Sequence, residues 1–210
     1  MGNYSGSPEH VGDASEGALR EGGDPGLKGR KTINIDAEIT DPMSDRTGTA
    51  DLDELSWLFA QVYWIENEME GSYEKAAFSA MKEEHKALLQ KISNDSQKHR
   101  LLLERVMKDV QKLDINAYLE PLKRKKFDLK GLSAREVFTE ILRRDRLAFD
   151  TYQKIRSSCA KELMETIWKG GDHDGFFRTI EDLIAAERKH IELVEEQISM
   201  IEKKGFHQSK

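Results

Sequence analysis

Five side chains with the chemistry of metal ligands interrupt otherwise apolar helical patterns in this sequence. They are Glu66, His99, Asp145, Glu187 and His190. All but His99 have apolar residues about one helical turn before and after them, and His99 follows Ser96 and precedes Leu103 on its face. The faces expected to be buried therefore carry polar groups near their middles. A buried carboxylate without a partner is unfavourable by on the order of several kcal/mol. Acids and imidazoles that converge in this way need a positive partner, and a metal ion supplies it.

The Glu187-x-x-His190 spacing has a physical reason. Residues three apart lie on one helix face about one turn from each other, so both side chains can reach a single ion. Mixed carboxylate and imidazole ligation suits iron, manganese or zinc better than calcium or magnesium. A charged helix also produces this motif by chance, as an exposed ladder of ion pairs. Asp145 has a second explanation too, because a pair with Arg144 or Arg146 would neutralise it.

The elements that must position these residues are long amphipathic helices. From Leu52 onward, apolar residues recur every three or four positions, which is the periodicity of a helix with one buried face. Four helices are expected, over about 55–80, 88–110, 138–159 and 176–201. The break between the first two is expected near 82–86. Residues 160–170 either extend the third helix or form a short connecting helix.

The connections follow a short, long, short order. The link from Leu113 to Ser133 is the long one and contains Pro121 and Gly131. This order is typical of an all-α, antiparallel four-helix bundle with one crossover between helices two and three, as in ferritin-like folds.

Helix ends are marked by capping residues. Ser133 with Glu136 forms a capping-box sequence for the third helix, and Gly205 can end the fourth. The remaining N-cap candidates are Asp51 or Asp53 for the first helix and Asp172 or Asp174 for the fourth.

Three regions are expected along the chain. Residues 1–48 are rich in Gly, Ser, Asp and Pro, which predicts a disordered extension because few apolar side chains offset the entropy of ordering. Residues 49–205 form the bundle, and 206–210 a short tail. The sequence MSDRTG at Met43 is typical of a natural start, so the first 42 residues are interpreted as an upstream extension or a remnant of recombinant expression.

Composition excludes several classes of partner. The net charge is −6, and the only long basic run, Lys123 to Lys126, is interpreted as a solvated loop, so no nucleic-acid partner is expected. No run of about 18 apolar residues occurs, so no membrane partner is expected. The single cysteine, Cys159, allows no disulfide within the chain and fits a cytoplasmic location. The neighbouring Tyr63, Trp64 and Ile65 give the first helix a second apolar face, which favours a homodimer.

The chain contains a weak internal repeat. A tyrosine follows seven residues after Glu66 and seven after Asp145. With the two histidines aligned, Ser96 corresponds to Glu187. The sequence therefore predicts two related helical hairpins, the pseudo-twofold arrangement that a two-metal site needs.

Four segments carry a resemblance to a known family: ENEMEGSYEKAA, NDSQKH, RDRLAFDTY and AAERKH. Together they resemble the rubrerythrin branch of the ferritin-like superfamily, whose helices carry Glu, Glu-x-x-His, Glu and Glu-x-x-His in order. The likeness spans roughly residues 52–203 and lacks a rubredoxin module. It implies that the five residues above are metal ligands, with Glu187 bridging. It also implies that Tyr73 and Tyr152 orient the ligating carboxylates.

Two departures from the family pattern matter. Ser96 stands where the family has a bridging glutamate, and Asp145 is one methylene shorter than glutamate. Ser96 and Asp95 are expected to lie next to the ligands, and Asp95 would replace the missing ligand only if the helix rotates or bulges. The expected cofactor is two iron ions, with manganese or zinc as alternatives, or a single ion because of Ser96.

The resemblance implies an oxidoreductase that reduces peroxide or reacts with dioxygen, or a ferroxidase that handles iron. The sequence does not separate these activities. The alternative is a degenerate, non-catalytic bundle that serves as a binding or scaffold protein or as a metal carrier, and Ser96 is the feature that favours it.

Overall fold

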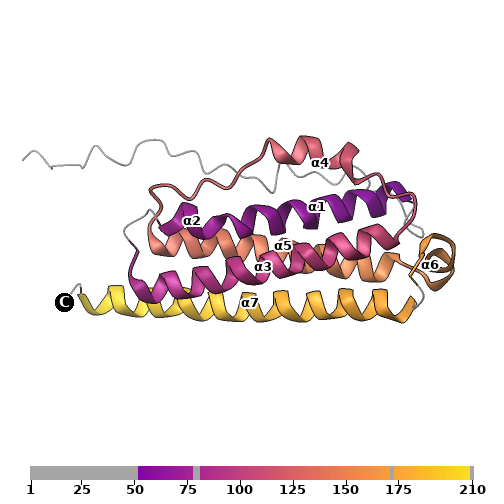
Figure 1. The fold of residues 1–210 in the computed structure, drawn as a ribbon. Coiled ribbons are helices and arrows are strands. Elements are labelled where there is room, and N and C mark those ends of the chain that lie inside the picture. The colour runs from indigo at the N-terminus through magenta and orange to yellow at the C-terminus, as the bar shows by residue number, and fades with distance from the viewer. Residues whose placement is uncertain (1–51, 78–80, 171–172, 209–210) are drawn as a thin grey trace, which may run out of the picture. The chain divides into compact units, whose positions relative to one another are not determined.

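The computed structural model describes residues 52–77, 81–170 and 173–208, and the named elements in these ranges are helices joined by loops (Figure 1). The helices are α1 (Leu52–Glu70), α2 (Ser72–Ala77), α3 (Glu83–Asp109), α4 (Ile115–Lys123), α5 (Ala134–Ser158), α6 (Lys161–Ile167) and α7 (His173–Gln208). The expected extension over residues 1–48 and the N-cap candidates Asp51 and Asp172 lie outside the described residues. No described helix is both long and apolar enough to cross a membrane.

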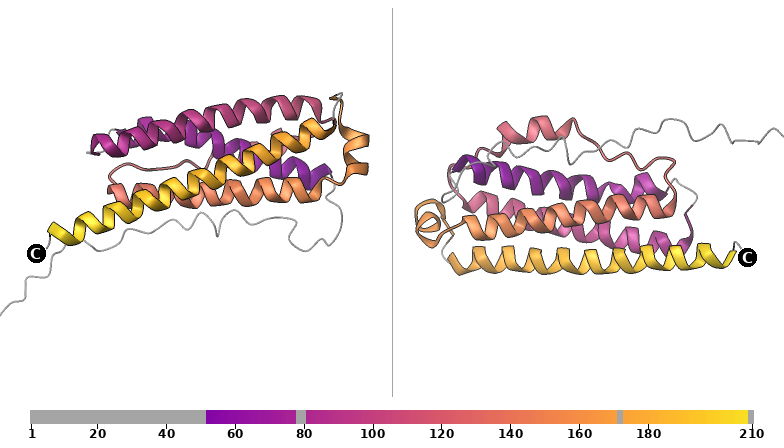
Figure 2. Two further views of the ribbon diagram at one scale, coloured as in Figure 1. Left: turned by 90° about the horizontal axis from the view of Figure 1, so that it is seen from below. Right: turned by 180° about the vertical axis from the view of Figure 1, so that it is seen from behind.

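The four long helices form a helical bundle. Helix α1 packs against α3 and α5, α5 packs against α7, and α3 approaches α7. The colour gradient in Figures 1 and 2 shows α1 and α7 running in one direction and α3 and α5 in the other. The link between α3 and α5 therefore returns along the length of the bundle before α5 begins.

The core consists of the apolar positions that recur every three or four residues. Fully buried examples from the four long helices are Phe59, Leu103, Phe138 and Ile180. Burial of a large apolar side chain contributes about 1.5–3 kcal/mol, so packing of these faces is the main force that holds the helices together. The all-helical prediction from periodicity is confirmed.

The capping box of α5 is confirmed. The Glu136 backbone N–H donates to Ser133 Oγ at 3.3 Å, and the Ser133 N–H donates to the Glu136 carboxylate at 2.7 Å. These two bonds satisfy backbone donors that the first turn of a helix leaves free. The end predicted for the last helix is wrong, because α7 continues through Gly205 to Gln208.

The first predicted helix is interrupted. Helix α1 ends at Glu70, Gly71 forms a turn, and the short α2 follows. Glycine has low helix propensity, and the Ser72 hydroxyl donates to the carbonyl of Met69 at 2.6 Å, which supports the turn. Asp53 lies inside the first turn of α1 and not before it.

The long link contains a helix that the periodicity did not predict. Helix α4 begins after Asp114, whose carboxylate accepts a hydrogen bond from the backbone N–H of Ala117 at 3.4 Å.

Helix α6 is separate from α5, which resolves the alternatives left open for residues 160–170. The Gln111 N–H donates to the carbonyl of Ile167 at 2.6 Å, so the end of α6 is tied to the chain just after α3.

The second apolar face of α1 is covered by the same chain. The Trp64 indole N–H donates to the carbonyl of Lys125 at 3.1 Å, and its ring meets Phe127 edge-on at 5.4 Å. The Arg144 guanidinium lies 4.3 Å from the centre of the Phe127 ring. This face therefore does not by itself argue for a second copy of the chain.

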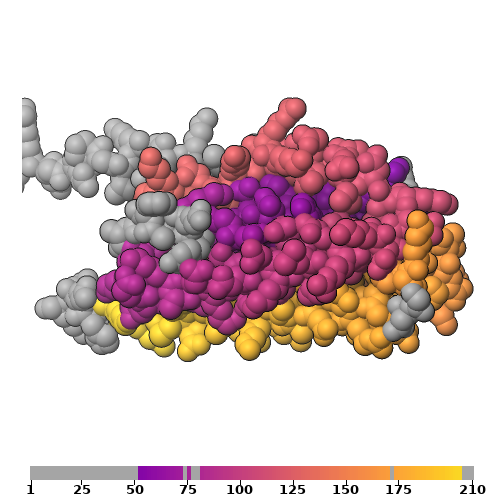
Figure 3. Space-filling view, in the orientation of Figure 1, coloured from indigo at the N-terminus to yellow at the C-terminus, as the bar shows by residue number. Residues whose placement is uncertain are grey.

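The space-filling view shows α4 and the link after it lying over α1 on the face drawn in Figure 3. Contacts between α1 and α4 agree with this view.

Candidate metal centre

The structure buries all five residues that the sequence proposes as ligands. Exposed fractions are 1% for Glu66, 6% for His99 and 2% each for Asp145, Glu187 and His190. They come from α1, α3, α5 and, for the last two, α7. The alternative of an exposed ion-pair ladder on α7 is therefore wrong.

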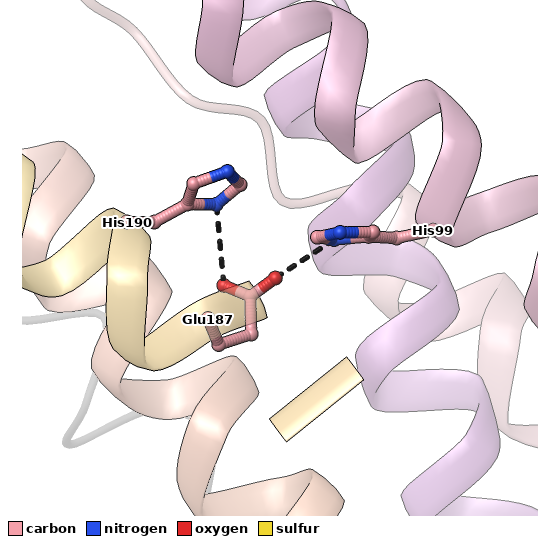
Figure 4. A group of neighbouring side chains, drawn as sticks. All are labelled: His99, Glu187 and His190. Atoms are coloured by element: carbon pink, nitrogen blue, oxygen red, sulfur yellow. Dashed lines mark ion pairs between the residues drawn. The ribbon is translucent and has the colours of Figure 1, made fainter. Parts of the chain in front are cut away.

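Glu187 lies between two imidazole rings (Figure 4). Its Oε1 is 2.8 Å from His99 Nδ1, and its Oε2 is 3.8 Å from His190 Nδ1. The two rings stack with centroids 5.5 Å apart and planes inclined by 29°. One ligand atom from each of the three residues lies within 4.8 Å of the others, so this buried group could hold a metal ion.

Three polar atoms of the group lack a hydrogen bond to the described residues. His99 Nδ1, Glu187 Oε1 and His190 Nδ1 are buried and have no aligned hydrogen-bond partner among the described residues. The 2.8 Å contact is thus an ion pair without hydrogen-bond geometry. Buried polar atoms almost always find a partner. Several buried nitrogen and oxygen atoms without a hydrogen bond at one place are therefore compatible with a bound cation.

Glu66 joins the group from α1. Its Oε1 lies 3.3 Å from His99 Nδ1 and accepts a hydrogen bond from the Tyr152 hydroxyl at 2.8 Å. The residue on α5 that the sequence proposes as an orienting group therefore contacts a candidate ligand. Tyr73 is its counterpart in the sequence, and the side chain of Tyr73 lies outside the described residues.

Asp145 is not among the three residues whose ligand atoms lie within 4.8 Å of one another. Its Oδ2 is buried and has no hydrogen-bond partner among the described residues. Arg146, one of its two proposed partners, forms an ion pair with Glu195 at 2.6 Å instead. Burial, with the negative charges of Glu187 and Glu66, holds the pKa of Asp145 well above its usual range.

The candidate ligands shift each other's protonation. Burial lowers the pKa of His99, but Glu187 and Glu66 outweigh it and raise that pKa to about 10. Burial and then the charge of Glu187 raise the pKa of Glu66. Burial also raises the pKa of Glu187, but His190 and His99 outweigh it, and the net direction is downward. In the metal-free protein, an imidazolium at His99 supplies part of the positive charge that an ion would bring.

Asp95 contacts the outer side of the group and not its centre. Its Oδ2 is 3.3 Å from His190 Nε2, the nitrogen that faces away from Glu187. Lys91 and Lys98 also pair with this carboxylate, at 2.5 and 2.7 Å. The sequence proposes Asp95 as a residue that supports the ligands, and as a substitute ligand only if α3 rotates or bulges. The geometry favours the supporting role, because Asp95 can orient His190 as carboxylates do for metal-bound histidines.

Ser96 is buried, with 3% of its surface exposed, and occupies the core face of α3 beside His99. The sequence gives His85 no role. His85 is also buried, with its Nδ1 2.8 Å from Gln197 Nε2 and its ring against Phe138, so it belongs to the core between α3, α5 and α7.

Comparison with known proteins adds no family to this geometry: no protein-family model matches the chain, and no curated protein matches it.

Proposed function

We propose that this chain is a ferritin-like metal protein of the rubrerythrin type with an iron centre inside the bundle. Glu66, His99, Glu187 and His190 would hold the metal, and Asp145 would lie at a second position. The centre would act in the reduction of peroxide or dioxygen, or in the oxidation and handling of ferrous iron.

The observation that carries the proposal is the place of Glu187. It sits buried between His99 and His190, and its Oε1, like Nδ1 of each histidine, forms no hydrogen bond with the described residues. The donor set of imidazole and carboxylate favours iron, manganese or zinc. The helix directions add support, because two hairpins joined by one long crossover are typical of ferritin-like bundles.

Each residue would have a defined task. An iron ion, when bound, supplies the redox chemistry with the oxidant. The carboxylates bind it and favour its oxidised state by their negative charge. Tyr152 fixes Glu66, and Asp95 fixes His190. The surrounding core, which includes Leu103 and Leu183, excludes water.

Metal analysis of full-length protein from iron-replete cells tests the proposal. Two irons per chain with a near-ultraviolet oxo-bridge absorption band support the full centre. The double variant Glu187→Ala with His190→Ala should abolish binding. The matched control is His173→Ala with Glu192→Ala on the same helix, which should bind as the parent does. Unchanged stoichiometry in the first variant refutes the ligand assignment.

A second candidate function is a bundle that has lost a complete centre and acts as a scaffold or metal carrier. Ser96 favours this second candidate, because it is buried at the position that corresponds to Glu187 in the internal repeat. Absence of any bound transition metal after growth in iron-replete medium would support this candidate. A single ion that exchanges freely with solution would support the carrier.

A further inference from the structure

Ser96 breaks the pseudo-twofold symmetry of the candidate centre. It lies three residues before His99 on α3, as Glu187 lies three before His190 on α7. The two histidine rings stack on each other, so these two halves of the chain face one another in the core. Ser96 is buried like Glu187, but it brings no charge.

No neighbouring acid replaces the missing carboxylate. Helix α3 is continuous from Glu83 to Asp109, so no bulge turns Asp95 inward. Asp95 is instead held by Lys91, Lys98 and His190 Nε2. The other acid buried on α1, Glu68, is paired with Lys75 and accepts the backbone N–H of Phe127.

The charge balance of the site then depends on how many ions it holds. Glu66, Asp145 and Glu187 together carry three negative charges when ionised, and all three are buried. One divalent ion leaves no positive excess. Two divalent ions carry four positive charges and leave one of them uncompensated in the core. Burying an uncompensated charge is strongly unfavourable, so the second ion needs an additional anion.

From this balance, and resting on the proposed function, we propose that a small exogenous monoanion with a carboxylate-like shape binds beside Ser96 and is required for the second metal ion. Formate and bicarbonate have the right chemistry. Serine has its hydroxyl where glutamate has its outer methylene, and it lacks the carboxylate, a group about the size of formate. The Ser96 hydroxyl donates a hydrogen bond to the bound anion. The number of metal ions is thereby controlled by a small anion.

The test is a cobalt(II) titration of the full-length, metal-stripped protein, followed by calorimetry and visible absorption. Cobalt is added as perchlorate in a sulfonate buffer free of chloride, formate and carbonate. One ion per chain is expected to bind without formate, and two with formate present. A single bound ion with and without formate overturns the proposal, as do two bound ions in the formate-free buffer, where hydroxide from water supplies the charge.

Variants of Ser96 sharpen the test. Ser96→Glu supplies the carboxylate from the chain and should bind two ions without formate. Ser157→Glu, an exposed serine on α5, is the matched control and should still need formate. Ser96→Ala should still require formate for the second ion, but its affinity for formate should be about fivefold weaker, the effect of one lost hydrogen bond.

The outcomes separate this proposal from the proposed function. If no cobalt binds under any condition, the metal centre itself fails. If one ion binds tightly in every buffer, the centre stands and the anion proposal is wrong. Circular dichroism checks that Ser96→Glu folds. Should it not fold, the comparison of the parent protein with and without formate still decides.

Discussion

The His190 ring is held between two carboxylates on different helices: its Nε2 lies 3.3 Å from Asp95 Oδ2 on α3, and its Nδ1 lies 3.8 Å from Glu187 on its own helix. With Asp95 accepting the Nε2 proton, Nδ1 is left as the free lone pair directed toward Glu187. A hydrogen bond on one ring nitrogen sets the tautomer and the orientation of the other. Asp95 thus positions a candidate ligand from outside the centre.

Replacing Asp95 with alanine should weaken metal binding without unfolding the bundle. The expected loss in cobalt(II) affinity is about 10–100-fold, the usual effect of removing such an orienting carboxylate. Isothermal titration of metal-stripped protein measures it. Glu83→Ala, an exposed acid on the same helix, is the matched control and should bind as the parent does. Equal cobalt(II) affinities for the two variants would mean that Asp95 forms ion pairs with its lysines but does not position His190.

Tyr152→Phe should destabilise the metal-free protein by about 1–3 kcal/mol, because the buried Glu66 carboxylate loses its donor while the ring volume is kept. Urea unfolding measures the change. Tyr63→Phe is the comparison, since the Tyr63 hydroxyl bonds to the partly exposed Glu104, which water can solvate. A smaller loss for Tyr152→Phe than for Tyr63→Phe would contradict the placement of Tyr152 at the centre.

Asp145→Asn should stabilise the metal-free protein at neutral pH and weaken metal binding. The native pKa of Asp145 is raised above its ordinary value of 3.8, first by burial and then by Glu187 and Glu66. Folding therefore favours the protonated acid. The stability this group supplies is complete below its ordinary pKa and is lost as pH rises through the native pKa. Asparagine resembles the protonated acid and does not ionise.

The measurement is urea unfolding of metal-stripped Asp145→Asn and parent protein between acidic and neutral pH. The stability difference in favour of the variant should grow as pH rises. Asp150→Asn, an exposed acid on the same helix, should show no such growth. Parallel pH profiles for Asp145→Asn and the parent would show that the Asp145 pKa is not raised in the native protein.

Much of the fold follows from periodicity, and the exceptions have physical causes. Apolar spacing predicts α3, α5 and α7, because long helices with one buried face have a strong signal. Helix α4 has only nine residues and carries Pro121, so its pattern is too short to stand out. The interruption of α1 at Gly71 depends on a single residue inside an otherwise continuous apolar pattern.

The candidate centre was predictable for a similar reason. A charged residue such as Glu66 or Glu187 within an apolar pattern is conspicuous, and both are buried. Asp95 has a weaker signal, since it lies off the buried face, and its contact with His190 depends on how α3 and α7 pack. Sequence also could not show that the link after α4 contacts Trp64, on the face of α1 that suggested a dimer.

Metal binding should release the proton that His99 holds in the metal-free protein. Its native pKa is about 10, with burial opposing and the Glu187 and Glu66 carboxylates raising it. The stability that this histidine supplies is complete below its ordinary pKa of 6.5 and is lost as pH rises through about 10. A metal ion competes with that proton, so cobalt(II) affinity should rise with pH across the neutral and alkaline range.

Calorimetry at neutral pH in two buffers of different ionisation enthalpy measures the protons that the protein releases. About one proton or more should be released for each cobalt ion that binds. The His99→Gln variant should release fewer protons, and release equal to that of the parent would show that the proton comes from another group.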